Sequence, residues 1–186
     1  MIPNIIHKTE RTERKENLLR ELKEQGIESY NIWEGVYSPN STMEGINLAH
    51  KQIVEWAKNE RLEKVLIFED DIKFTDKGAW KYFLNNEPKE YDIYLGGIYL
   101  GVINEGLVSA FTALHCYVVH SRFYDKFLSV KSDLHLDHAL ADGGKYIVCE
   151  PMIAVQYNGW SDNSAAVCNY DNIISQRKLF TLQNQN

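Results

Sequence analysis

The sequence Val65-Leu66-Ile67-Phe68-Glu69-Asp70-Asp71 joins an uncharged apolar run directly to three consecutive carboxylates. The β-branched and aromatic residues of 65–68 predict a buried central strand. Three acids at the end of this strand repel one another unless a positive group lies among them. At the carboxyl end of a strand in an α/β sheet, that group is usually a ligand or a metal ion. The alternative is that one acid caps a following helix and the other two are solvated.

The size and composition of the chain indicate an ordinary globular protein. Its 186 residues suffice for one domain with a substantial core, and 44% are hydrophobic and 25% charged. The formal net charge of −6 argues against nucleic acid as a partner. We see no membrane-spanning stretch and no signal peptide, and three cysteines without CxxC spacing fit reduced thiols. We therefore expect a cytoplasmic protein, for which peripheral contact with a membrane stays open.

Apolar runs and amphipathic stretches alternate along the chain. They predict strands at residues 3–7, 29–33, 65–68, 91–95, 113–119 and 146–148. They predict helices ending at Gly26, over 45–59, over 76–85, from Ser121, and from Asp133 to the glycine pair 143–144. Residues 98–109 form either a hairpin or a mobile loop, and the chain is polar and irregular from 159, with a tail from about 164. This order predicts a single domain over 1–186, an α/β/α sandwich with a mainly parallel central sheet.

The acidic motif has the chemistry of a divalent-cation site. Mn²⁺ and Mg²⁺ prefer oxygen ligands and take one or two carboxylates together with substrate phosphates. Glu69 and Asp71 are two residues apart, so in an extended segment they project to the same side, with Asp70 opposite. Glu69 and Asp71 are therefore the predicted metal ligands, and Asp70 is expected to bind backbone amides or a ribose hydroxyl. Metal-dependent hydrolases and phosphotransferases use similar clusters.

Four basic or titratable residues, His7, Lys8, Arg11 and Arg14, follow the first predicted strand. Arginine suits phosphate through its forked donors, and a loop after a parallel strand lies on the ligand side of the sheet. The alternative is that the two arginines pair with neighbouring glutamates on a solvated helix.

Three further polar stretches are candidates for the site. Gly45 precedes a predicted helix and lets backbone approach a ligand, and His50 follows in the second turn. Asp137 near a helix start is either a cap or a general base, while its flanking histidines lack the third nearby ligand that zinc needs. The stretch from Gln156 to Asp162 sets polar side chains beside an aromatic, which suits a sugar or a phosphate as well as an ordinary loop.

In this order, the motifs resemble glycosyltransferase family 25, the lipopolysaccharide-type galactosyltransferases with a GT-A fold. The segments that carry the resemblance are Arg11–Arg14 (R-x-x-R), Trp33–Gly35, Gly45–His50 (G-x-x-x-S-H), Glu69–Asp71, Cys116–Ser121, Leu136–Leu140 and Pro151–Asp162. They cover roughly residues 2–163. Two departures are Ala49, where the family has serine, and a chain shorter than is usual for the family.

The resemblance implies a UDP-linked donor of galactose or a similar hexose, and Mn²⁺ or Mg²⁺ bound by Glu69 and Asp71. The acceptor would be a hydroxyl of a glycan, glycolipid or glycoprotein, with Asp137 as the base of an inverting transfer. The residues assigned to the donor are His7, Arg11, Arg14, His50, Asp70 and Gln156. Glycines between 96 and 106 permit either a lid over the donor or a plain hairpin.

Two other functions are compatible with the same residues. One is a GT-A domain that binds a nucleotide sugar or glycan without transfer. The other is a metal-dependent phosphotransferase or hydrolase that uses the acidic motif and needs no acceptor sugar.

Overall fold

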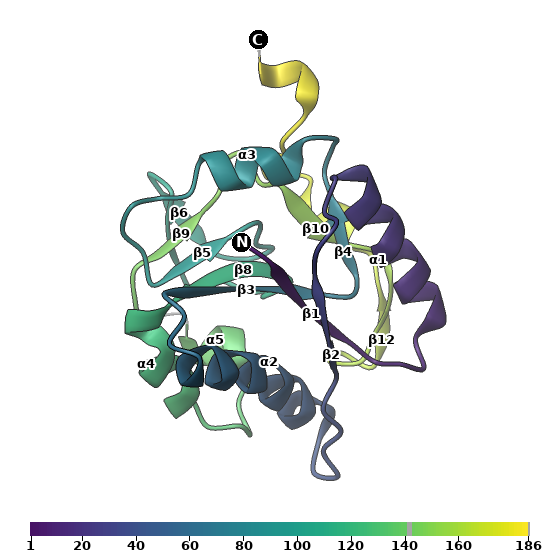
Figure 1. The fold of residues 1–186 in the computed structure, drawn as a ribbon. Helices are drawn as coiled ribbons and strands as arrows, with labels where there is room; N and C mark the ends of the chain where they lie inside the picture. The colour runs from purple at the N-terminus through teal and green to yellow at the C-terminus, as the bar shows by residue number, and fades with distance from the viewer. Residues whose placement is uncertain (141–142, 186) are drawn as a thin grey trace.

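The computed structural model describes residues 1–140 and 143–185. Within them, an eight-stranded sheet lies between two layers of helices (Figure 1). Its strands in spatial order are β2 (Asn31–Glu34), β1 (Pro3–His7), β3 (Lys64–Glu69), β8 (Cys116–His120), β5 (Ile93–Leu95), β9 (Tyr146–Val148), β7 (Leu107–Ser109) and β6 (Val102–Asn104). All of these strands except β7 and β8 run in the same direction. The predicted α/β sandwich with a mainly parallel sheet is confirmed.

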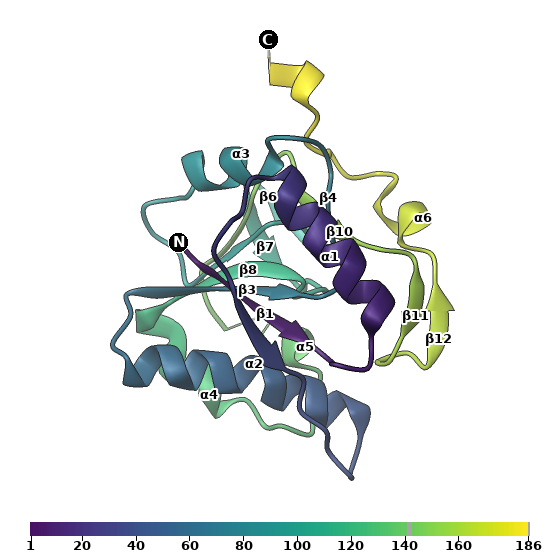
Figure 2. The ribbon, with the colours of Figure 1, turned by 45° about the vertical axis from the view of Figure 1, so that its right-hand side comes forward.

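Each face of the sheet carries its own layer of helices. Helices α1 (Thr12–Glu24) and α3 (Ala79–Asn85) pack on one face, and α2 (Thr42–Asn59), α4 (Tyr124–Ser129) and α5 (Leu136–Leu140) pack on the other (Figure 2). Helix α2 begins three residues earlier than predicted because Ser41 caps it, its hydroxyl accepting from the Glu44 amide at 3.1 Å. No helix among the described residues is long and apolar enough to cross a membrane.

Strand β3 is buried on both faces. Val65 and Ile67 belong to the apolar cluster under α2 and α4, and Leu66 and Phe68 belong to the cluster under α1 and α3. The alternation continues into the acidic motif, so Glu69 is directed toward α2 and the next residue toward α1. The buried strand therefore determines which helix each carboxylate meets.

Several local predictions need correction. Strand β4 (Ile72–Phe74) starts just after the acidic motif and pairs with β10 (Ala154–Gln156), but three residues give too short an alternation to predict a strand. For residues 98–109, where a hairpin and a mobile loop were the two alternatives, the structure has the hairpin of β6 and β7. Helix α5 starts at Leu136 rather than Asp133, and its predicted continuation to Gly143 crosses residues 141–142, which lie outside the described residues.

The region after 158 was predicted to be irregular, and it contains regular elements. Strands β11 (Gly159–Ser161) and β12 (Ala166–Cys168) form a hairpin, and α6 (Tyr170–Ile174) and a short 3₁₀ helix (Leu182–Gln185) follow. Figure 2 shows the hairpin and α6 at the same side of the molecule as α1. The strands are short and rich in polar and small residues, so their sequence carries no apolar alternation strong enough to distinguish them from a loop.

The central strand supplies a test of the fold. We expect Leu66→Ala to lower the free energy of unfolding by about 3 kcal/mol, because it leaves a cavity in a fully buried position. Leu19→Ala on the exposed side of α1 is the matched control and should cost less than about 1 kcal/mol. Urea unfolding of both variants measures the difference. Equal losses would contradict the central placement of β3.

Candidate functional site

A cavity of about 320 Å³ opens where β1, β2 and β3 end. Its wall brings together the segments that the sequence singled out. The residues from these segments are Lys8, Arg11, Arg14, Gly45, His50, Glu69, Asp70, Asp71, Asp137, Gln156 and Asp162. Carboxyl ends of parallel strands are the usual location of ligand sites in α/β folds.

Glu69 and Asp71 converge on one side chain. The Gln156 Nε2 atom donates to Glu69 Oε2 at 2.9 Å and to Asp71 Oδ1 at 3.0 Å, as expected for two acids that project to the same side. His50 reaches Glu69 Oε1 from α2, with its Nε2 at 3.2 Å, and its Nδ1 is 2.8 Å from the Tyr117 hydroxyl. One neutral tautomer satisfies both contacts, with Tyr117 donating to Nδ1 and Nε2 donating to Glu69.

Asp70 is directed toward β1 and α1, and both of its carboxylate oxygens are paired within the protein. Its Oδ2 is 2.8 Å from His7 Nδ1, and its Oδ1 accepts from Arg14 Nη1 at 2.9 Å. His7 was assigned to the nucleotide, but the structure places it behind Asp70 and off the cavity wall. The reason is the alternation of β1, which turns Ile6 into the cavity and His7 to the other face of the sheet.

Arg14 also pairs with Asp71, whose Oδ2 lies 3.1 Å from Arg14 Nη1. Burial raises the pKa of Asp71 to about 7, the Glu69 charge adds to this rise, and Arg14 opposes it. Burial also tends to raise the pKa of Glu69, but the His50 hydrogen bond and the nearby positive charges lower it overall. Arg14 is partly desolvated, yet the carboxylates of Asp71 and Asp70 raise its pKa, so it stays charged.

Lys8 and Arg11 share another carboxylate. Lys8 Nζ is 3.0 Å from Asp162 Oδ2, and Arg11 Nη2 donates to Asp162 Oδ1. Asp162 belongs to the turn between β11 and β12, so the hairpin is fastened across the end of the cavity by these contacts. Arg11 and Arg14 thus pair with aspartates from distant segments, and the alternative of pairs with neighbouring glutamates is wrong.

Asp137 lies in the cavity wall at the start of α5. Its Oδ2 accepts from the Ala113 amide at 3.1 Å, and its Oδ1 accepts from the His138 amide at 2.9 Å. Ala113 has a φ of +87°, a left-handed conformation that costs energy in a residue with a Cβ. The strained amide points at the carboxylate and fixes its orientation in the cavity.

Two tyrosines of the site were not predicted. The Tyr99 hydroxyl accepts a hydrogen bond from the backbone amide of Gln156 at 2.7 Å. The Tyr170 ring stacks on the Tyr99 ring, with centroids 4.7 Å apart. Tyr170 lines the cavity and comes from α6, in the region predicted to be irregular. Both act through contacts between distant segments, and no local motif marks them.

The carboxylates that would hold Mn²⁺ or Mg²⁺ already have partners within the protein. Five of the six oxygens of Glu69, Asp70 and Asp71 accept hydrogen bonds from His50, Gln156, Arg14 or His7, and the sixth, Asp71 Oδ2, forms an ion pair with Arg14. Among the described residues, no group of three or more His, Cys, Asp or Glu has the arrangement of a metal site. This donor set does not fit a divalent ion without rearrangement, because the ion would have to displace N–H donors.

Gly45 lies in the first turn of α2 rather than before the helix. A Cβ at this position would lie 2.4 Å from the Val36 carbonyl oxygen. The glycine therefore lets the loop after β2 approach the helix, and residues from both line the cavity. Gly45 therefore permits close packing of the cavity wall.

Comparison with known proteins identifies the class of fold. No protein-family model matches the chain, and no curated protein matches it. The chain is similar to A197 from STIV, with a TM-score of 0.53 and 12% identity over 84% of this chain and 86% of that chain. A glycosyltransferase involved in the glycosylation of the major capsid of PBCV-1 gives a TM-score of 0.53 and 14% identity over 89% of this chain and 97% of that chain. HddC from Yersinia pseudotuberculosis complexed with GMP-PN gives a TM-score of 0.50 and 11% identity over 80% of this chain and 90% of that chain.

These identities are low, so the likeness shows the fold alone. The chain has a mixed α/β fold of the GT-A type. Membership of glycosyltransferase family 25 stays a prediction.

The close approach at Gly45 can be tested by substitution. We expect Gly45→Ala to destabilise the protein by about 1–2 kcal/mol, since the overlap with Val36 outweighs the gain in helix propensity. Glu55→Ala, on the exposed face of the same helix, should change stability by less than about 0.5 kcal/mol. Thermal and urea unfolding measure both. A Gly45→Ala protein more stable than wild type would contradict the packing role.

Proposed function

We propose that this chain is a glycosyltransferase that moves a hexose from a UDP-linked donor to a hydroxyl of a glycan acceptor. The supporting observation is that one cavity on a GT-A-type fold has both cationic side chains at one end and Asp137 in its wall. Lys8 and Arg11 supply the charge that a diphosphate needs. Asp137 supplies a carboxylate held in a fixed orientation. Galactose as the sugar, and a glycolipid or glycoprotein as the acceptor, follow from the resemblance to family 25.

The proposed reaction is a direct displacement at the anomeric carbon. The acceptor oxygen forms the new bond to that carbon while the bond to the diphosphate breaks, and the diphosphate leaves with the electron pair. Asp137 takes the proton of the acceptor hydroxyl. Lys8 and Arg11 offset the charge that develops on the departing diphosphate. Attack from the face opposite the leaving group inverts the configuration.

The proposed base has a direct test. We expect Asp137→Asn to lower kcat by about 100-fold or more, with the Kd for UDP changed by less than about twofold. The amide keeps the size of the side chain but cannot accept the proton. A coupled assay of UDP release across an acceptor panel measures kcat, and calorimetry measures UDP binding. Wild-type turnover in this variant would remove Asp137 from the role.

A control separates this effect from changes to the local loop. Asp133→Asn alters an exposed acid four residues away and should leave kcat within about twofold of wild type. The same assays separate transfer from binding alone. UDP-sugar binding without turnover on any acceptor would favour the non-catalytic GT-A domain, and turnover without an acceptor sugar would favour a hydrolase or phosphotransferase.

The contacts of Asp162 with Lys8 and Arg11 predict that substitution of Asp162 raises the affinity for the donor. Asp162→Asn removes the carboxylate that Lys8 and Arg11 share, which leaves both cations available to a diphosphate. We expect UDP to bind about threefold more tightly, in line with the small energy of part-exposed ion pairs. Asp125→Asn, which removes an exposed pair with Lys58, is the matched control and should have no effect. Unchanged or weaker UDP binding to Asp162→Asn would contradict the assignment of the two cations.

A further inference from the structure

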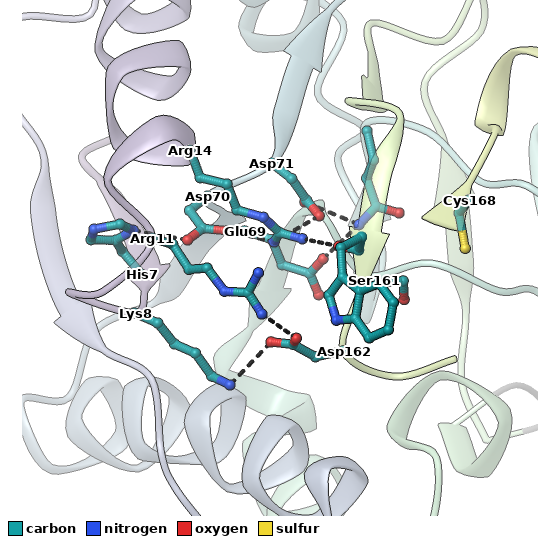
Figure 3. A network of polar contacts seen from close by, with 12 residues as sticks. His7, Lys8, Arg11, Arg14, Glu69, Asp70, Asp71, Ser161, Asp162 and Cys168 are labelled. Atoms are coloured by element: carbon teal, nitrogen blue, oxygen red, sulfur yellow. Dashed lines mark hydrogen bonds and ion pairs between the residues drawn. The ribbon is translucent and has the colours of Figure 1, made fainter. Parts of the chain in front are cut away.

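The Arg14 guanidinium lies among the carboxylates of the acidic motif. Its Nη1 atom is 2.9 Å from Asp70 Oδ1 and 3.1 Å from Asp71 Oδ2 (Figure 3). Its Nη2 atom donates to the Trp160 carbonyl oxygen at 2.6 Å. The positive charge that three adjacent acids need to offset their repulsion is therefore supplied by a side chain of the protein.

The fold itself holds Arg14 in this position. It lies in the first turn of α1, and Leu18 and Leu22 of the same helix are buried in the apolar cluster between the sheet and helices α1 and α3. The Asp70 and Asp71 side chains are almost fully buried, with 8% and 10% of their surface exposed. A guanidinium has no neutral form at physiological pH and presents fixed donors to carboxylates. The charge balance of the motif therefore exists before any ligand binds.

The remaining carboxylate oxygens are also hydrogen-bonded. His7 binds Asp70, His50 binds Glu69, and the Gln156 amide lies between Glu69 and Asp71. Mn²⁺ and Mg²⁺ need oxygens free of such donors at about 2.0–2.2 Å. A metal at this motif would have to break the Arg14 pairs and turn the Gln156 amide away.

We propose that Arg14 is the resident cation of the acidic motif and that nucleotide diphosphate binding requires no divalent ion. The first statement stands on the geometry alone, and the second rests on the function proposed above. Lys8 and Arg11, whose carboxylate partner is the more exposed Asp162, then meet the charge of the diphosphate. In this proposal, the fixed charge of Arg14 takes the place of the Mn²⁺ or Mg²⁺ that the family resemblance implies.

Titration of metal-free protein with Mn²⁺ tests the first statement. The loss of the free-ion signal in electron paramagnetic resonance reports binding without any substrate. We expect the wild type to bind Mn²⁺ only at about millimolar concentrations or weaker. Arg14→Met should bind it about tenfold or more tightly, because three carboxylates lose their counter-charge. Arg14→Lys keeps the charge and should resemble the wild type.

The double variant Arg14→Met with Asp71→Asn controls for the site of binding. It should lose the gained affinity if the ion binds the freed carboxylates. Micromolar Mn²⁺ binding by the wild type, unchanged in Arg14→Met, would overturn the assignment of Arg14.

A second measurement uses only the wild-type protein, so it holds even if Arg14→Met fails to fold. Calorimetry of UDP binding in a chelator and in Mn²⁺ should give Kd values within about twofold of each other. UDP binding that appears only with Mn²⁺ overturns the metal-independent part of the proposal while the transferase function stands. If UDP binds in neither condition, the proposed function fails, and the Mn²⁺ titration still decides the role of Arg14.

Discussion

Three adjacent carboxylates at the end of β3, of which Asp70 and Asp71 are buried and Glu69 is partly exposed, contact side chains from four other elements. His7 comes from β1, Arg14 from α1, His50 from α2 and Gln156 from β10. A buried carboxylate without partners costs several kcal/mol, so these four contacts must form together with the fold. The acids thereby determine where α1, α2 and β10 meet. The cavity is the space that remains between those elements, in front of the motif.

Much of this arrangement could be predicted from the sequence. The apolar run of β3 and its alternation set the direction of each acid, and the order of elements predicts the sandwich. The acidic motif and the basic segment after the first strand were predicted to lie at carboxyl ends of strands, and most of their residues line one cavity. These predictions succeeded because they depend on the backbone period and on the topology of parallel strands, which local sequence determines.

The contacts between side chains could not be predicted. Lys8 and Asp162 are 154 residues apart, and Gln156 reaches Glu69 across 87 residues. Nothing local specifies such partners. Ile5 and Ile6 of β1 are both apolar, so the sequence does not indicate which of the two side chains faces α1 and which faces α2. The direction of the His7 side chain follows only from the pairing of β1 with the neighbouring strands. Three-residue strands such as β4 and β11 depend on tertiary pairing rather than on propensity.

The two sets of ion pairs differ in how readily a ligand can exchange them. Lys8 and Asp162 are 34% and 21% exposed, and pairs of this kind contribute about 0–1 kcal/mol. Asp70 and Asp71 are far more buried, and removing a partner from a buried pair costs about 3–5 kcal/mol. Under the proposed function, an incoming diphosphate therefore displaces Asp162 from its cations while the pairs of Arg14 stay intact. In the proposed reaction, the cationic end of the cavity adapts to the donor, and the acidic motif behind it acts as a rigid wall.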